Sequence, residues 1–290
     1  MAKSTKNVNA PEASAGVQET ALANVPTQAL GSSSMPAWLA KRMAAAAPRG
    51  LEKVTSDDII YPRLLLMQGL SPLVAEGKRR VGEIVDNLTG DLLCGVGDKL
   101  EFIPVVMSRT RMFLKPIAEG GGMLCRSDDS LNARRGGCGV DQGGNPTLVC
   151  ADCVHKEWND SAKDESGKGG KPKCTMFYNI VGLLPEHDFR PVVWSGKSTN
   201  TKVMKRFLSL SKQTGADFFA LKYQLLSVEA QSGQFKFKNW DFAPVGYVSE
   251  DEYKRGEQMY ASLKGKTWAA DTTDLETDGD TDPQSEPTFP

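Results

Sequence analysis

Cysteine is the residue type whose spacing in this sequence most clearly predicts chemistry. Five of the six cysteines fall between residues 117 and 174, and two of them form the pattern Cys150-x2-Cys153. This spacing places two thiolates on one tight turn, where both reach the same metal ion, and a second pair completes a tetrahedral site. The sequence therefore predicts a structural Zn2+ held by Cys125, Cys150, Cys153 and Cys174.

The choice of the second pair depends on the segments that flank the cysteines. Cys125 and Cys174 lie where strand-like runs enter and leave the cysteine-rich segment, whereas Cys138 lies among glycines and is the alternative fourth ligand. His155 is a weaker substitute. The segment has few large aliphatic residues, so burial alone cannot fold it, whereas zinc binding supplies folding free energy directly.

The remaining cysteine and the redox alternative have separate explanations. Cys94 lies in a strand-like run beside Gly95 and is predicted to be a buried thiol outside the metal site. A redox role for the CxxC pattern lacks the surrounding βαβ pattern of thioredoxin-like proteins. Unligated thiols are the simpler alternative to the zinc site.

Patterns typical of enzymes are missing from the sequence. The histidines, His155 and His187, lie in no HExxH or triad-like setting, and no Walker A or dinucleotide-binding GxGxxG context is found. Asp57-Asp58 and Asp128-Asp129 are adjacent pairs, which a strand or helix points in different directions, so they do not support a two-metal site. We expect a binding protein rather than an enzyme.

Charge is distributed unevenly along the chain. The net charge is −1, and residues 271–290 contain seven Asp or Glu and no Lys or Arg, which leaves +6 on residues 1–270. A basic body favours binding of polyanions, and an acidic tail competes with them or recruits basic partners.

Two strand-like runs combine basic and aromatic residues on one side. Proteins hold single-stranded DNA by stacking bases on aromatic rings and by tracking the phosphates with Lys and Arg. Strand alternation places the members of each run on one face. The predicted DNA-binding residues are Arg109, Arg111, Phe113 and Lys115 in the first run, and Lys236, Lys238, Trp240 and Phe242 in the second.

The elements that must position these residues are mostly short strands separated by turn residues. The expected strands are Arg79–Asp86, Leu92–Val96, Leu100–Ser108, Thr110–Pro116, Cys174–Leu184, Phe189–Trp194, and a hairpin of Phe218–Glu229 and Gln234–Val248 around Ser232-Gly233. Helices are expected from Ser34 to about Pro48, over 56–68, over Thr199–Gln213, and from Ser249, whose spacing to Glu252 matches a capping box, to about Leu263.

This inventory predicts a mainly β (α+β) fold, an OB-like β-barrel with an inserted Cys-rich zinc subdomain and a few flanking helices. We expect a disordered N-terminal segment 1–33, a nucleic-acid-binding domain 34–270 with the inserted zinc-binding loop 117–174, and a disordered acidic tail 271–290. The sequence has no apolar run long enough for a membrane span and no signal-like block, so a cytoplasmic location is expected.

The acidic end of the chain resembles the C-terminal tail of bacterial and T7-type phage single-stranded DNA-binding proteins, which carries a late aromatic residue. In those families the tail recruits replication proteins and shields the binding groove. The resemblance implies partner binding by Asp278, Asp280, Asp282, Glu286 and Phe289.

The combination of an OB-like barrel and a zinc site is similar in design to the T-even phage helix-destabilising protein. That family uses one His and three Cys, whereas this chain would use four Cys. The resemblance implies a protein that coats single-stranded DNA in phage DNA replication, recombination or repair.

Two other classes of function fit part of the sequence. A zinc-ribbon adaptor or transcription-related protein would bind protein partners or duplex DNA, and a metal-dependent nuclease would turn DNA over. Oligomeric state is left open.

Overall fold

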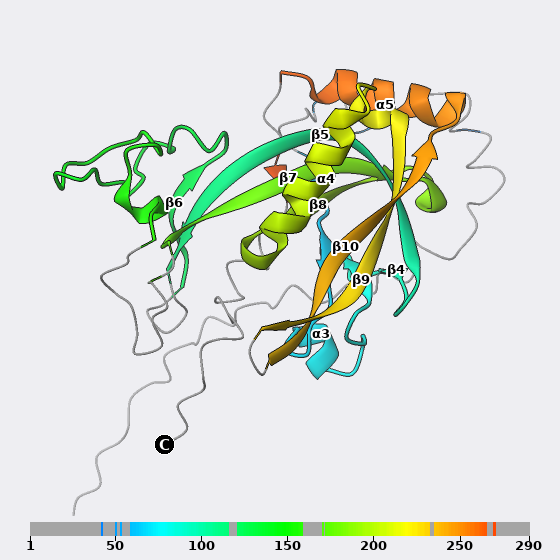
Figure 1. Ribbon diagram of the computed structural model, residues 1–290, viewed down its shortest axis with the longest axis horizontal. Coiled ribbons are helices and arrows are strands. Elements are labelled where there is room, and N and C mark those ends of the chain that lie inside the picture. Colours follow the sequence, from blue (N-terminus) through cyan, green and yellow to red (C-terminus); the bar gives the residue numbers. More distant parts are fainter. Residues whose placement is uncertain are drawn as a thin grey trace, which may run out of the picture. The chain divides into compact units, whose positions relative to one another are not determined.

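The computed structural model describes part of the chain. The described residues are 42, 50, 53, 59–115, 121–158, 170, 172–232, 235–265 and 269–270. The chain divides into two units, Met1–Leu51 and Glu52–Pro290, and only Arg42 and Gly50 of the first are described. The second unit is mainly β, with antiparallel sheets and few helices, which confirms the predicted class at that level (Figure 1).

The largest sheet is antiparallel and has six strands. Its order is β10-β9-β5-β7-β8, and β6 pairs with the end of β5. The strands are β5 (Lys99–Leu114), β6 (Met123–Ser127), β7 (Cys174–Leu184), β8 (Arg190–Gly196), β9 (Leu221–Ser232) and β10 (Phe235–Tyr247). The sequence predicts β7, β8 and the β9–β10 hairpin to within a few residues, because their apolar alternation ends at turn residues.

The central strand β5 is longer than the sequence predicts. The run was expected to break at Arg109, but β5 continues through that residue and pairs with β7 as far as Phe113. Its first residues, Lys99–Phe102, pair with β9, and its last residues pair with β6. One strand thus pairs with β9 at its start and with β7 and β6 further along. Its register with β7 shifts between Pro104 and Val106.

Two small sheets precede β5 in the sequence. The strands β2 (Leu64–Leu66), β3 (Ile84–Asp86) and β4 (Leu92–Cys94) form a meander, and β1 (Ile60–Tyr61) pairs in parallel with β11 (Ala269–Ala270). The helix predicted over 56–68 is therefore wrong wherever that segment is described. Pro62 disfavours helical geometry for the residue before it, and the apolar run Leu64–Leu66 gains its hydrogen bonds from β3 instead.

The segment that contains β2, residues 62–68, lies between β8 and β10, the two edge strands of the large sheet. We call it the β2 segment. On one side the Val193 N–H of β8 donates to the Pro62 carbonyl over 2.8 Å. On the other side the Gln68 side-chain amide donates to the Lys238 carbonyl of β10 and accepts from its N–H, at 2.9 and 3.0 Å. The described strand order runs from β10 to β8, and these two edge strands do not pair with each other. The β2 segment connects them.

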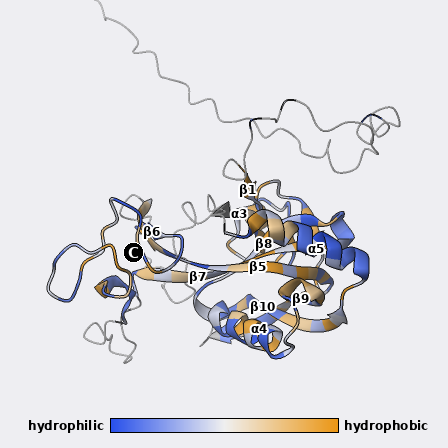
Figure 2. Cartoon of the chain, turned by 90° about the horizontal axis from the view of Figure 1, so that it is seen from above, coloured by the Kyte–Doolittle hydropathy of each residue, from blue (hydrophilic) through white to orange (hydrophobic). Residues whose placement is uncertain are grey.

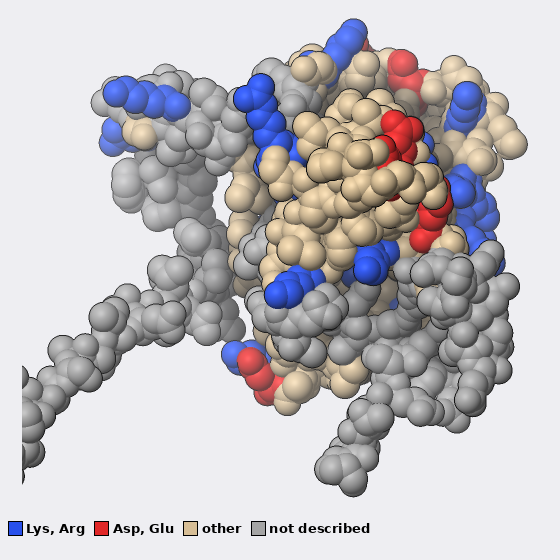
Figure 3. All heavy atoms as spheres, turned by 90° about the vertical axis from the view of Figure 1, so that its left-hand side faces the viewer, with Lys and Arg blue, Asp and Glu red and all other residues tan. Residues whose placement is uncertain are grey.

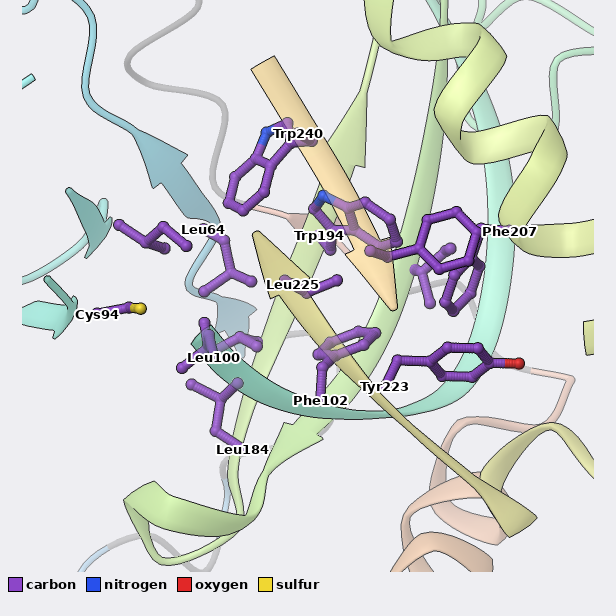
Figure 4. Close-up of a cluster of buried hydrophobic side chains, with 14 of the residues drawn as sticks. Leu64, Cys94, Leu100, Phe102, Leu184, Trp194, Phe207, Tyr223, Leu225 and Trp240 are labelled. Atoms are coloured by element: carbon purple, nitrogen blue, oxygen red, sulfur yellow. The ribbon is translucent and has the colours of Figure 1, made fainter. Parts of the chain in front are cut away.

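A cluster of aromatic and aliphatic side chains fills the space inside these strands. Trp194 is fully buried, with ring centroids 5.1 Å from Phe207 and 6.0 Å from Phe102. Figure 4 shows Trp194 between Trp240 and Phe207, with Leu64 of β2 in the same cluster. These rings come from three strands and helix α4, which lie far apart in the sequence, so the core fixes how these elements pack.

Two longer helices cover opposite faces of the β5–β7 strands (Figure 2). Helix α4 (Thr201–Gln213) buries Met204 and Phe207 in the main core. Helix α5 (Glu250–Leu263) packs Met259 against the other face. The predicted capping box is confirmed: Ser249 Oγ accepts from the Glu252 N–H, and the Glu252 carboxylate accepts from the Ser249 N–H at 2.7 Å.

The remaining helical elements are short. They are α3 (Pro72–Ala75) and the 3-10 turns η3 (Val154–Lys156), η5 (Pro185–His187), η6 (Ser198–Asn200) and η7 (Phe218–Ala220). The helix predicted from Ser34 lies outside the described residues except for Arg42, which is helical. None of the helices in the described ranges is long and apolar enough to cross a membrane.

Candidate functional site

The cysteine-rich module, residues 121–158, is a hydrogen-bonded structure beyond the end of β5. Its strand β6 pairs with β5, and two isolated bridges, Asn132 with Val149 and Val140 with Pro146, tie its two halves together. The sequence shows no periodicity here because bridges of single residue pairs leave no alternating pattern. Figure 1 shows the module at the β6 end of the long β5 and β7 strands.

Cys125 and Cys138 meet in the first half of the module. Cys125 lies on β6, and the Cys138 backbone N–H donates to its sulfur. Burial raises the pKa of the Cys125 thiol; that hydrogen bond opposes the rise, and the neighbouring thiols of Cys138, Cys150 and Cys153 add to it. Three cysteine side chains are thus close enough to act electrostatically on Cys125.

The other two cysteines of this group lie on one turn. The Cys150 N–H donates to the Leu131 carbonyl at 2.8 Å, and the Val154 N–H donates to the Val140 carbonyl at 2.9 Å. The predicted turn of the Cys150-x2-Cys153 pattern is therefore fixed at both ends. Cys150 is buried, and Cys153 is partly buried.

Cys174 is separated from this group by a strand. In the register of the sheet, Cys125 of β6 and Cys174 of β7 are both partners of Phe113, on opposite sides of β5. Burial raises the pKa of the Cys174 thiol to about 11, and the neighbouring Cys125 and Cys150 thiols add to the rise, although Arg111 acts to lower it. Cys174 is therefore an electrostatic neighbour of the same group, and the sheet register places Phe113 between Cys174 and Cys125.

His155 and Cys94 have other neighbours. The His155 ring lies 5.0 Å from the Phe113 ring, centroid to centroid, so it packs on β5. Cys94 is 6% exposed on β4, which confirms its prediction as a buried thiol, and burial raises its pKa to about 11. No group of three His, Cys, Asp or Glu side chains in the described ranges is arranged with metal-binding geometry.

The first predicted DNA-binding strand keeps its side chains on one face, as alternation requires. Arg109 is exposed, and Arg111, Phe113 and Lys115 are partly buried. Arg109 pairs with Tyr178 across to β7, and Tyr178 pairs with Gly196 on β8. The face thus continues from the cysteine-rich module toward the main core.

The second predicted strand places its aromatic residues in the core. Trp240 is 5% and Phe242 8% exposed, and they contact Trp194 and Phe207. Their prediction as base-stacking residues is wrong for the folded chain, because the β2 segment and α4 cover that side of β10. Sequence parity could not reveal this cover.

The lysines of the same strand lie nearer the hairpin tip. Lys236 is exposed, and the Lys238 ammonium lies 3.4 Å from the Glu229 carboxylate on β9. The four predicted side chains of β10 therefore share one face as predicted, but the lysines lie toward solvent and the aromatic rings lie in the core.

Helix α4 carries a basic surface that was not assigned to DNA binding from the sequence. Its thirteen residues include four Lys or Arg and no Asp or Glu. Lys202, Lys205 and Lys212 are exposed, and Arg206 pairs with Asp241. The sequence indicates this surface, because every charged residue of the predicted helix is basic. On the face in Figure 3, Lys and Arg stand apart and Asp and Glu lie among them.

The proposed partner-binding residues Asp278, Asp280, Asp282, Glu286 and Phe289 lie outside the described residues.

The fold and the cysteine group define a mainly β protein with a cysteine-rich module inserted between two strands of its main sheet. Residues 26–269 match the model of a protein family described as Pam3 phage gp34-like protein. The chain therefore belongs to the Pam3 phage gp34-like family and is a phage protein. No curated protein and no solved structure matches it.

Proposed function

We propose that this phage protein binds single-stranded DNA with little sequence preference and serves phage DNA replication, recombination or repair by binding rather than catalysis. The observation that carries the proposal is helix α4, which has exposed lysines and no Asp or Glu. A phage protein with a positively charged body fits this role, because phosphate neutralisation supplies most sequence-independent affinity.

The proposed surface follows one cross-strand row of residues. Arg109, Tyr178 and Gly196 are successive partners across β5, β7 and β8, and strands are about 4.8 Å apart, so Arg109 lies about 9.5 Å from Gly196. A Cβ at Gly196 would collide with Met204 of α4, so the helix packs directly on this row. We propose that the exposed lysines of α4 and Arg109 contact the same DNA strand.

An OB-like barrel is the finer description of the fold that this function favours. Its support is the β2 segment, which bonds to β8 through Pro62 and to β10 through Gln68 and so spans the open side of the sheet. The core cluster enclosed by these strands includes residues from all of them. OB folds bind single strands on the outside of such a barrel.

The distribution of charge predicts which contacts supply affinity. We propose phosphate contacts by Arg109, Lys202 and Lys205. Phe113 contacts His155, and Trp240 and Phe242 are buried, so stacking by these rings is not part of the proposal. Affinity should therefore depend steeply on salt.

The test is a titration of fluorescent single strands at several salt concentrations. The double variant Lys202→Ala, Lys205→Ala should reduce the slope of log affinity against log salt by about 1.4, since each phosphate contact on a single strand contributes about 0.7. The matched control is Lys78→Ala, Lys254→Ala, which removes the same charge from other elements and should leave the slope nearly unchanged.

Three results would contradict the proposal. An unchanged slope in the α4 variant, or an equal change in the control, would mean that α4 is not the contact surface. Equal affinity for duplex would favour an adaptor or transcription-related protein. Metal-dependent cleavage of the strand would favour a nuclease.

The acidic tail is proposed to compete with DNA and to recruit replication proteins. Seven tethered carboxylates on residues 271–290 act at high effective concentration on a body of charge +6. Deletion of 271–290 should therefore tighten single-strand binding, and the gain should shrink as salt rises. Phe289→Ala is the control, because it removes no charge and should leave DNA affinity unchanged.

A further inference from the structure

We infer that Cys125, Cys138, Cys150 and Cys153 bind one Zn2+ that holds the cysteine-rich module together. Four thiolates form a soft ligand set that suits tetrahedral zinc. This inference concerns the folding of the module and is independent of the proposed DNA binding.

The module lacks a hydrophobic core. Within residues 121–158, all of which the structure describes, Cys150 is the only buried hydrophobic residue. Most of the large apolar side chains there are exposed, for example Leu131 at 59% and Trp158 at 64%. Burial therefore offsets little of the conformational entropy lost when the module orders, and a bound metal is the usual replacement.

Cys138 lies between the two halves of the module. Its N–H donates to the Cys125 sulfur, an interaction typical of the second shell that orients metal ligands. A Cβ at Gly137 would lie 2.9 Å from the Cys125 sulfur, and one at Gly139 would lie 3.6 Å from the Cys153 sulfur. The backbone around Cys138 thus lies directly against both sulfurs, and glycine at 137 leaves room for the first of them.

The strand register separates Cys174 from Cys125. Zn–S bonds of about 2.3 Å place two sulfurs of a tetrahedral site about 3.8 Å apart. Cys125 and Cys174 lie on strands separated by β5, at about twice the 4.8 Å strand spacing, with the Phe113 side chain on the same face between them. Joining both to one ion would require Phe113 to leave the face.

We expect zinc to bring the four thiols to one ion by side-chain rotation. Their sulfurs do not form a metal-binding arrangement among the described residues, but the backbone turns that carry them are fixed by hydrogen bonds. Rotation about χ1 between staggered wells moves a sulfur without moving its strand or turn. Zinc would select the rotamers that converge.

The decisive experiment removes Cys174 from the full chain. Cys174→Val keeps an apolar side chain on β7, and with Cys94 buried on β4 it leaves only the proposed four cysteines for a four-thiolate site. Chain purified without chelator should contain one zinc per molecule by elemental analysis, as should the variant. Replacement of zinc by Co2+ should give both the same tetrahedral four-thiolate absorption spectrum.

Cys138→Ser is the complementary variant. It should lose the four-thiolate cobalt spectrum and bind zinc at least 100-fold more weakly, while circular dichroism reports whether the body stays folded. Loss of zinc from Cys174→Val, retention of the four-thiolate spectrum by Cys138→Ser, or wild-type chain that binds no zinc would overturn the inference. If Cys138→Ser does not fold, the spectrum of Cys174→Val decides alone.

Discussion

The body of the sheet and the cysteine-rich module reach order by different physical means. The body buries Trp194, Phe102, Phe207 and their neighbours completely or nearly so, and its rings contact one another edge to face. The module, residues 121–158, buries no large aliphatic or aromatic side chain and gathers four thiols instead. Burial is therefore sufficient to explain the first region and insufficient for the second.

This difference explains why the two regions can vary independently. They share the β5–β7 strands, but the module contacts them through β6 and through the Phe113–His155 pair, far along β5 from the main core. Removal of zinc from the module, or of a buried ring from the body, should therefore leave most of the other region folded.

The largest effect is expected from removal of metal. Structural zinc contributes about 10–16 kcal/mol to the folding of small zinc-binding peptides, so a strong chelator should unfold the module completely. Hydrogen exchange should then speed up at amides of 121–158 and stay slow at Ile180, Val193 and Leu225. Retained protection of the module amides after complete chelation would show that the module folds without metal.

The next largest effect is expected in the body. Trp194→Ala removes a fully buried ring that contacts Phe102, Phe207 and Trp240, and should lower the free energy of unfolding by about 3–5 kcal/mol. Denaturant unfolding followed by circular dichroism measures this loss. Trp158→Ala, at a residue 64% exposed in the module, is the matched control and should change it by less than about 0.5 kcal/mol.

A smaller effect is expected at the start of α5. Ser249→Ala removes the side-chain acceptor of the capping box and should cost about 1 kcal/mol of unfolding free energy. Ser262→Ala, near the other end of the same helix, should cost less because that hydroxyl bonds only to the carbonyl and the sulfur of the nearby Met259. Equal losses in both variants would mean that the cap contributes nothing special.

The smallest effect is expected at an exposed leucine of the module. Leu131→Ser should leave zinc content and module stability within about 0.5 kcal/mol of wild type, because the side chain is 59% exposed. Thermal unfolding monitored by release of zinc to a colorimetric indicator measures it. A large loss would show that apolar contacts, rather than thiolates, hold the module.

The sequence alone determined those elements whose signals are local. Alternation bounded by turn residues located β7, β8 and the β9–β10 hairpin, the apolar stripe with its closing Gly215 located α4, and Ser249 with Glu252 located the start of α5. The spacing of Cys150 and Cys153 located their turn. These signals suffice because each depends on residues a few positions apart.

Only the tertiary structure decided which faces are covered and which residues meet. Trp240 and Phe242 have the alternation of a solvent-facing strand, but α4 and the β2 segment cover them. The run over 56–68 resembles a helix until β3 offers Leu64–Leu66 its hydrogen bonds. The backbone beside Cys138 lies against the Cys125 sulfur, whereas the sheet register places Phe113 between Cys125 and Cys174. Register and cover depend on pairing between distant segments, and no local pattern encodes them.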